Sequence, residues 1–167
     1  MKTTLRFFKN HLSAKDPVFS TRQSSCFDLH ASLPNDEHVK WRCHDVDEVM
    51  VVKDSKIVIH PEERWLVPTG LIFDIPEGWS MRLHPRSGLA YKQGLVLANC
   101  EGVIDSDYVE PVYMMMMTYG KDPVEIYDGE RICQGELVRD EFYEFKQTSR
   151  RPMRKTDRDG GIGSTGV

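Results

Sequence analysis

Two carboxylates in the stretch "GVIDSDYVE" (102–110) are candidates for proton-transfer chemistry. If this segment is extended, Asp105 and Asp107 project from the same face because they are two residues apart. Asp105 follows two apolar residues and precedes Tyr108, so its carboxylate would lie in a partly dry site, where it could take a proton from water as a general base. A polar turn is the alternative, because turns favour Asp-Ser-Asp. On this stretch alone the turn is favoured.

The stretch "HPRSGLAYKQG" (84–94) is a candidate anion site. Backbone N–H groups and a hydroxyl at the start of a helix bind anions, and here Ser87 would supply the hydroxyl. Arg86 adds a planar guanidinium suited to phosphate. The alternative is a simple N-cap by Ser87 beside a solvated Arg86, which is favoured when the stretch is taken alone. In a third stretch, "YDGERICQG", Arg131 and Gln134 follow a tight turn at 128–129.

The last residues, "GIGSTG" (161–166), match the glycine pattern of dinucleotide-binding loops. That pattern requires a following helix, and the sequence contains none after it. The preceding residues from about 146 are basic and polar, as in segments without a packed core. We therefore expect a flexible tail, and a flap that becomes ordered when a ligand binds is one interpretation of it.

Composition indicates an ordinary soluble domain of 167 residues, with a net charge of −4, 40% hydrophobic and 29% charged residues. Without a basic excess, direct nucleic-acid binding is not expected. No apolar run approaches the roughly 20 residues of a membrane span, and we find no secretory signal. The four cysteines are widely spaced, which favours free thiols in the cytoplasm. His38, Cys43 and His44 fit no zinc spacing, so they are interpreted as part of a polar loop.

Short β-branched or apolar runs separated by Gly and Pro predict an all-β barrel or sandwich. We expect a strand at 3–8, a hairpin over 48–60, and two or three strands over 64–85 with breaks at 68–70 and 76–78. Further strands are expected within 94–104, 109–120 and 124–138, and one short helix at 86–94. The four methionines at 114–117 predict a central strand buried on both faces.

Five stretches together resemble, in order, the five motifs of the trimeric dUTP pyrophosphatases (dUTPases). They are "SSCFDLHASL", "PRSGLA", "ANCEGVIDSDY", "DGERICQ" and "RDGGIGSTG". The similarity runs from about Leu5 to the last residues. Each motif is weak alone, but five in order at plausible spacing are highly specific.

The resemblance implies a homotrimer of jelly-roll-like distorted barrels (the β-clip fold) with one short helix and a flexible C-terminal arm. It implies a barrel domain at 1–145, an insert around 34–60 and an arm at 146–167. Active sites would lie between subunits, each built from three chains. The implied reaction is Mg²⁺-assisted hydrolysis of dUTP to dUMP and pyrophosphate, which limits uracil in DNA and supplies dUMP for dTMP synthesis. The implied location is the cytoplasm, or a host's cytoplasm for a viral protein.

The resemblance also implies roles for individual residues. Asp105 corresponds to the carboxylate that activates the water attacking the α-phosphorus. Asn99 corresponds to a uracil contact, and Tyr108 to a ring under the deoxyribose that excludes a 2′-hydroxyl. Asp28 would support Mg²⁺ through water, in keeping with the waters that Mg²⁺ retains. Further implied substrate contacts in the second, third and fourth motifs are Arg86, Ser87, Gly88, Gly102 and Gln134.

The fifth motif departs from the family pattern. Ile162 stands where the family has Phe, so stacking on uracil is lost and weaker nucleotide affinity is expected. Arg158 is the implied γ-phosphate ligand, with Arg154 and Lys155 as alternatives. The remaining implied arm contacts, which would wrap the phosphates, are Gly163, Ser164 and Thr165.

Two other functions stay open. A dCTP deaminase shares the fold, but its Thr-Leu-Glu-like stretch is replaced here by "VYMMMMTYG". A regulatory protein that uses the insert, including Trp41, to bind an unknown protein is the second alternative, with catalysis secondary.

Overall fold

A computed structural model of the chain describes residues 3–157. In agreement with the predicted all-β class, these residues form short strands and one short helix. In chain order the elements are β1 (Arg6–Lys9), β2 (Phe27–His30), β3 (His38–Cys43), β4 (Val46–Val51), β5 (Lys56–Ile59), β6 (Glu63–Pro68), β7 (Leu71–Asp74), β8 (Trp79–Pro85), α1 (Ser87–Gln93), β9 (Leu95–Leu97), β10 (Gly102–Ile104), β11 (Tyr113–Thr118), β12 (Val124–Tyr127) and β13 (Arg131–Arg139).

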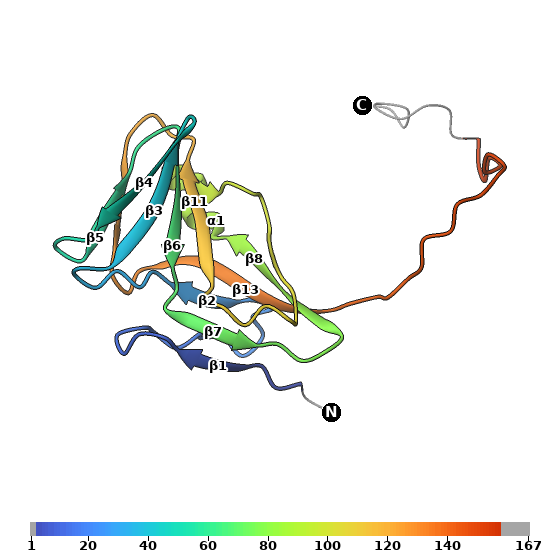
Figure 1. Ribbon diagram of the computed structural model, residues 1–167, viewed down its shortest axis with the longest axis horizontal. Helices are drawn as coiled ribbons and strands as arrows, with labels where there is room; N and C mark the ends of the chain where they lie inside the picture. The colour runs from blue at the N-terminus through green and yellow to red at the C-terminus, as the bar shows by residue number, and fades with distance from the viewer. Residues whose placement is uncertain (1–2, 158–167) are drawn as a thin grey trace.

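Within the described residues the strands do not close into the expected barrel but form four antiparallel sheets (Figure 1). The larger sheets have the strand orders β10-β8-β13-β2 and β4-β3-β6-β11-β9, and β1-β7 and β12-β5 form two small ribbons. The chain changes sheet at the predicted break before Gly70, whose φ of 68° suits glycine. Short strands that switch sheets at such breaks leave the larger sheets with open edges.

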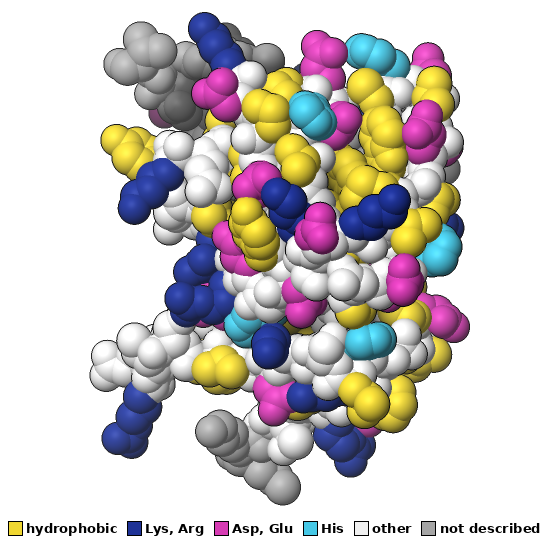
Figure 2. Space-filling model, turned by 90° about the vertical axis from the view of Figure 1, so that its left-hand side faces the viewer, with side chains coloured by type: hydrophobic (Ala, Val, Ile, Leu, Met, Phe, Trp, Pro, Cys, Tyr) yellow, Lys and Arg dark blue, Asp and Glu magenta, His cyan; other side chains and the backbone are white. Residues whose placement is uncertain are grey.

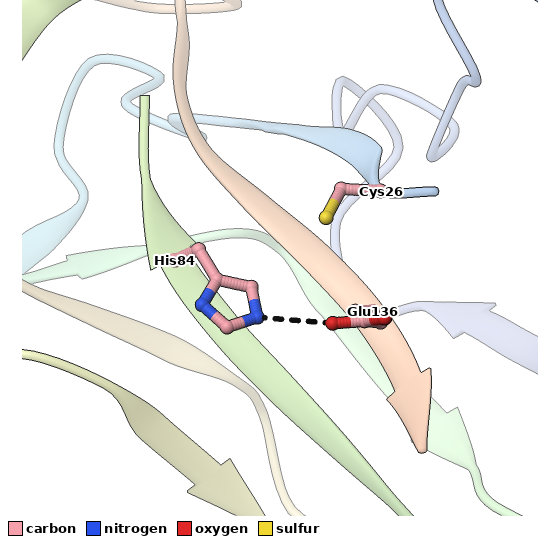
Figure 3. Close-up of side chains that lie close together, drawn as sticks. All are labelled: Cys26, His84 and Glu136. Carbon is pink, nitrogen blue, oxygen red and sulfur yellow. Dashed lines mark ion pairs between the residues drawn. The ribbon is translucent and has the colours of Figure 1, made fainter. Parts of the chain in front are cut away.

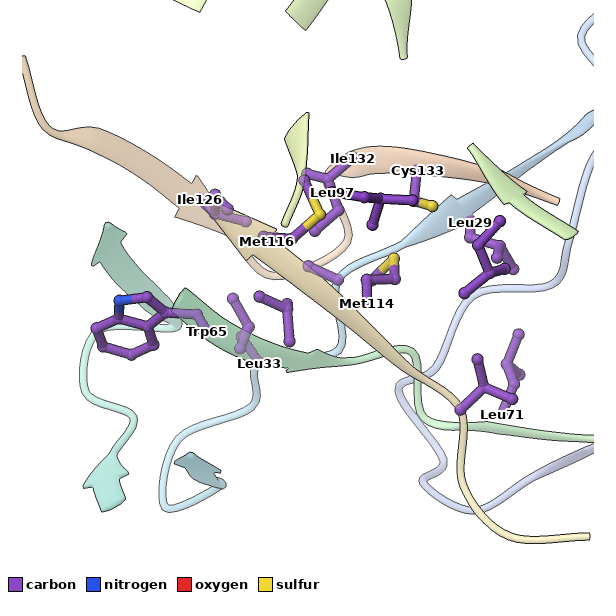
Figure 4. Packing of buried hydrophobic residues seen from close by; sticks show 14 of the residues in the cluster. Leu29, Leu33, Trp65, Leu71, Leu97, Met114, Met116, Ile126, Ile132 and Cys133 are labelled. Atoms are coloured by element: carbon purple, nitrogen blue, oxygen red, sulfur yellow. The ribbon is translucent and has the colours of Figure 1, made fainter. Parts of the chain in front are cut away.

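The two larger sheets pack their apolar faces together to form the core (Figure 4). Met114 and Met116 of β11 are fully buried there, whereas Met115 is 37% exposed. The predicted burial of this strand on both faces is therefore wrong, although β11 is central, between β6 and β9. An antiparallel sheet with one face on the core buries alternate residues, and β11 follows that rule.

The hairpin predicted over 48–60 is also wrong. Both runs are strands, but β4 pairs with β3 and β5 pairs with β12. Only a single bridge, between Lys53 and Lys56, joins the two sides of the turn. The turn is local, as the sequence indicated, but the partners of the strands are set by contacts with distant segments.

The 34–60 segment is built mainly from the β3-β4 hairpin and β5, which lie at the left of Figure 1. Figure 2 views the molecule from that side and shows hydrophobic side chains gathered among charged ones in its upper part. Trp41 stacks on Trp65 of the neighbouring strand, with ring centroids 5.5 Å apart and planes 13° apart. Beside it lies a groove of about 450 Å³, lined in part by Val49, Leu66 and Met115. Packing within the sheet therefore accounts for Trp41.

After β13 the chain leaves the body. Residues 141–157 are exposed and have no strand or helix (Figure 1). The described helix is far too short and polar to be a membrane-spanning segment.

Candidate active site

A buried carboxylate is the centre of one group of predicted site residues. Asp28 of β2 is 2% exposed, and its Oδ1 accepts a hydrogen bond from Gln134 Nε2 at 3.2 Å. Its Oδ2 accepts hydrogen bonds from Ser20 Oγ at 2.7 Å and Arg131 Nη1 at 3.0 Å. Arg86 Nε lies 3.5 Å from Oδ1. The sheet order places β13 beside both β2 and β8, which brings these residues together.

The surroundings of Asp28 favour its ionised form. Burial alone would raise the pKa of this carboxyl, but the hydrogen bonds from Ser20, Gln134 and Arg131, together with the Arg86 charge, lower the pKa below its ordinary value. Asp28 is therefore a carboxylate at neutral pH, held by charge-assisted hydrogen bonds of the strong kind.

The second motif begins α1, but Ser87 is not the N-cap that the simpler alternative predicted. The N-cap residue is Arg86, without a side-chain cap, and Ser87 is the first helical residue. Arg86 donates from Nη1 to the Arg131 carbonyl at 2.8 Å, which anchors the start of the helix to β13. Ser87 and Gly88 are exposed. A serine that does not cap its own helix keeps its hydroxyl available to a ligand.

The third motif lies on a different part of the surface. Asp105 directly follows β10, and its carbonyl accepts a hydrogen bond from the Tyr108 N–H at 3.2 Å, so the segment forms the turn considered above. The Tyr108 hydroxyl donates to the Pro111 carbonyl at 3.1 Å, which orients the ring. Asn99, Asp105 and Tyr108 are all exposed.

Gly102 of the same motif is buried and lies opposite Leu83 in the sheet. A Cβ at this position would come within 2.9 Å of the Leu83 side chain. Packing against β8 therefore requires glycine here, independently of any ligand.

The described residues of one chain do not bring the two groups together. Ile104, just before Asp105, pairs with Met81 near the start of β8, whereas Arg86 follows the other end of that strand. At about 3.3 Å per residue, the strand separates these ends by roughly 17 Å. Asp105 therefore leaves the sheet at the end opposite Arg86, Asp28 and Gln134.

The predicted site residues of the fifth motif are not placed by the structure. Arg158, Ile162, Gly163, Ser164 and Thr165 lie outside the described residues.

Two partners of Asp28 were not predicted as site residues. Sequence reasoning missed Ser20 as a partner of Asp28, and no motif marks it. It noted Arg131 in the fourth motif but did not assign it to the site, although Arg131 lies three residues before Gln134.

Two arginines, a buried carboxylate and an amide on one face of a small all-β protein define a class of site suited to anionic ligands. Comparison with known proteins makes the class specific. The dUTPase family model matches residues 48–166. The chain is 38% identical over 151 residues to the deoxyuridine 5′-triphosphate nucleotidohydrolase of Finegoldia magna, covering 90% of each chain. It is 43% identical over 118 residues to that of Brucella melitensis, covering 70% of this chain and 74% of the relative.

Solved structures show the same fold. A variant of the Staphylococcus bacteriophage 80alpha dUTPase with dUpNHpp superposes with a TM-score of 0.73 at 21% identity, covering 99% of this chain and 100% of that one. The dUTPase of phage phi11 of S. aureus gives 0.68 at 18% identity, with coverages of 89% and 98%. The chain belongs to the dUTPase family.

Proposed function

We propose that this protein hydrolyses dUTP to dUMP and pyrophosphate. The observation that carries the proposal is family membership over most of the chain, with the residues to which the first four motifs assign a role, Asp28, Arg86, Asp105 and Gln134 among them, all present. Asp105 is the general base: its exposed carboxylate takes a proton from a water that attacks the α-phosphorus, and pyrophosphate leaves. Its position in a turn at the end of β10 supports this role, because a turn presents the carboxylate outward.

A complete site requires more than one copy of the chain. Asp105 lies at the far end of β8 from Arg86, so one chain offers two incomplete halves. In a homotrimer, a heterologous interface repeated around a threefold axis would place the third motif of one chain against the first, second and fourth motifs of the next. The 146–167 arm of another chain would then cover the nucleotide, with the 1–145 domain as the body.

The Asp28 cluster is the phosphate side of the proposed site. Arg86, Ser87 and Gln134 bind phosphate oxygens, with the Gly88 N–H beside them at the start of α1. The cluster supports only indirect contact with Mg²⁺. Two acceptor positions on Asp28 Oδ2 are filled by Ser20 and Arg131, and one on Oδ1 by Gln134. The remaining position on Oδ1, which has Arg86 Nε 3.5 Å away, would accept a water bound to Mg²⁺, and Mg²⁺ would neutralise charge on the phosphates.

The third-motif side recognises the nucleoside. Asn99 hydrogen-bonds uracil, and the Tyr108 ring packs under the deoxyribose where a 2′-hydroxyl would collide with it. The Tyr108–Pro111 hydrogen bond supports this role, because a ring fixed by its own chain excludes by shape. The arm residues Arg158, Ile162, Gly163, Ser164 and Thr165 close over the base and phosphates, and the protein works in the cytoplasm.

The experiment is pyrophosphate release from dUTP, dCTP, dTTP and UTP with Mg²⁺. Selective cleavage of dUTP, abolished in Asp105→Asn, is expected. Deamination of dCTP, or dUTP left intact by a folded protein, would overturn the proposal.

A further inference from the structure

Three side chains to which no motif assigns a role meet on one face of the β10-β8-β13-β2 sheet. They are Cys26, just before β2, His84 of β8 and Glu136 of β13 (Figure 3). Their Sγ, ring nitrogen and carboxylate oxygen atoms all lie within 4.8 Å of one another. Among the described residues, no other set of His, Cys, Asp and Glu donors meets in this way, and His38, Cys43 and His44 do not.

The strand register explains why these side chains converge. Gln134 lies opposite His84 on one side and Asp28 on the other, so all three project from the same face. Cys26 is two residues from Asp28, and Glu136 is two residues from Gln134, which keeps them on that face. The trio therefore occupies a row beside the Asp28–Gln134 pair and connects three neighbouring strands.

The spacing matches metal coordination better than hydrogen bonding. His84 Nε2 lies 3.4 Å from Glu136 Oε2, beyond the usual N–H···O range of about 2.7–3.2 Å. Nε2 is buried from solvent and has no hydrogen-bond partner among the described residues. Tetrahedral Zn²⁺, with bonds of about 2.0–2.3 Å, holds its ligand atoms roughly 3.3–3.8 Å apart. The three donor atoms lie within 4.8 Å of one another, so a cation between them needs a closing movement of about 1 Å or less.

The other ring nitrogen of His84 faces a second carboxylate. Glu101 Oε1 lies 3.8 Å from His84 Nδ1. Metal-bound histidines commonly present the second ring nitrogen to a carboxylate, which fixes the tautomer with Nε2 free to bind. At 3.8 Å this pair is beyond hydrogen-bond range, so Glu101 would need a small rotation to do this for His84.

We propose that Cys26, His84 and Glu136 form a binding site for Zn²⁺ or a similar borderline-soft divalent cation. A thiolate, an imidazole and a carboxylate are the donors of zinc sites, with water completing four-coordination. The donor set is the wrong one for Mg²⁺, which takes oxygen ligands. The site is separate from dUTP hydrolysis. A bound cation would link β8 and β13 to the start of β2, and so would stabilise the part of the sheet that carries Asp28 and Gln134.

A reactive thiol is a weaker account of Cys26. Burial, and then the Glu136 carboxylate, raise the pKa of the Cys26 thiol. A thiol in an electronegative setting is a poor nucleophile, because reactive cysteines need positive surroundings.

The test uses the full-length protein, stripped of metal and titrated with Co²⁺ and Zn²⁺. Thiolate ligation predicts a near-ultraviolet sulfur-to-cobalt charge-transfer band at one equivalent per chain, displaced by Zn²⁺. The band should vanish in Cys26→Ser and persist in Cys43→Ser, a cysteine of similar partial exposure on another sheet. Glu101→Gln should weaken Zn²⁺ binding by about 10- to 100-fold without removing the band.

Thermal unfolding with and without Zn²⁺ provides the second measurement, and circular dichroism checks that each variant folds. Zn²⁺ should raise the Tm of the parent and of Cys43→Ser, but not that of Cys26→Ser or Glu136→Gln. The absence of a charge-transfer band in the parent would overturn the proposal. So would a band that survives Cys26→Ser, or equal Zn²⁺ stabilisation of all variants.

Discussion

The Asp28 cluster and the third-motif turn are two halves of one proposed site, and the chain builds them very differently. Asp28 is 2% exposed and is held by side chains from three separate segments of the chain, namely Ser20, Arg86 and β13. Asp105 is exposed, and its turn is closed by a hydrogen bond between backbone atoms of Asp105 and Tyr108. The Asp28 cluster is complete within one chain, whereas the third-motif turn presents its side chains to solvent.

This difference in burial separates residues that stabilise the fold from residues that are available for catalysis. A residue such as Asp28, whose oxygens are already engaged, contributes mainly by holding the site and the sheet. A residue such as Asp105, which contributes little to its own chain's packing, is available to substrate and to a neighbouring copy. Substitutions in the two halves should therefore fail in different ways.

The largest expected effect is loss of catalysis in Asp105→Asn. Removing a general base costs about 10²- to 10⁴-fold in kcat. Because Asp105 is exposed, the Tm of the Asp105→Asn variant should stay within a degree or two of the parent's. Asp107→Asn, in the same turn, is the matched control and should keep most of the activity. Comparable losses in both variants, measured by pyrophosphate release, would remove the special role of Asp105.

Next in size is a stability loss in Asp28→Asn. Breaking a fully buried ion pair costs roughly 3–5 kcal/mol. The Arg131 side chain is 50% exposed, so water screens the freed cation and about 2 kcal/mol is expected. Urea unfolding measures this difference, and a variant as stable as the parent would show that the cluster does not hold the sheet.

The same carboxylate predicts a pH dependence of stability. Because the folded pKa of Asp28 is lowered, its stabilising contribution is fully present above the unfolded value of about 3.9 and is lost as pH falls through the folded pKa. The stability difference between the parent and Asp28→Asn should therefore shrink in acid. A difference that is constant from neutral pH into that acidic range would contradict this.

A smaller effect is expected on sugar selection. Tyr108→Ala removes the proposed barrier to a 2′-hydroxyl, so UTP should gain about 10- to 100-fold in kcat/KM relative to dUTP. Tyr108→Phe keeps the ring and loses only the hydrogen bond to Pro111, so selection should persist. If the two variants discriminate equally, the ring is not the barrier.

The smallest expected effect concerns Ile162→Phe. Isoleucine is itself apolar, so a stacking ring in its place should add about 1 kcal/mol of binding and lower the KM for dUTP roughly fivefold. An unchanged or higher KM in steady-state kinetics would show that the loss of stacking does not limit binding.

Local signals predicted much of the fold. Glycine and proline breaks located β6, β7 and β8, and the Arg86–Gly94 stretch produced the one short helix. The hairpin predicted over 48–60 was wrong because a tight turn says nothing about which distant strand a segment will pair with. Burial of Met115 was overestimated because four identical residues hide the alternation of a sheet with one exposed face.

The site was only partly predictable, because some of its contacts depend on pairing between distant strands. Motif order identified Asp28, Arg86 and Gln134, and the register of β2, β8 and β13 brings them together. Ser20 was not predictable, because a serine that reaches a carboxylate across a loop has no local pattern. The meeting of Cys26 with His84 and Glu136 depends on three strands pairing, which no spacing in the sequence encodes.

The central claim is that Asp105 of one copy acts with Arg86 of another, and mixed oligomers test it most directly. Asp105→Asn and Arg86→Ala chains, each inactive alone, would be co-expressed with different affinity tags and purified through both. If the site is shared in a threefold ring, every mixed trimer holds one intact site of three, so about one third of the parent activity should return. Mixed trimers as inactive as either variant alone would place both residues in the same chain's site and contradict the account.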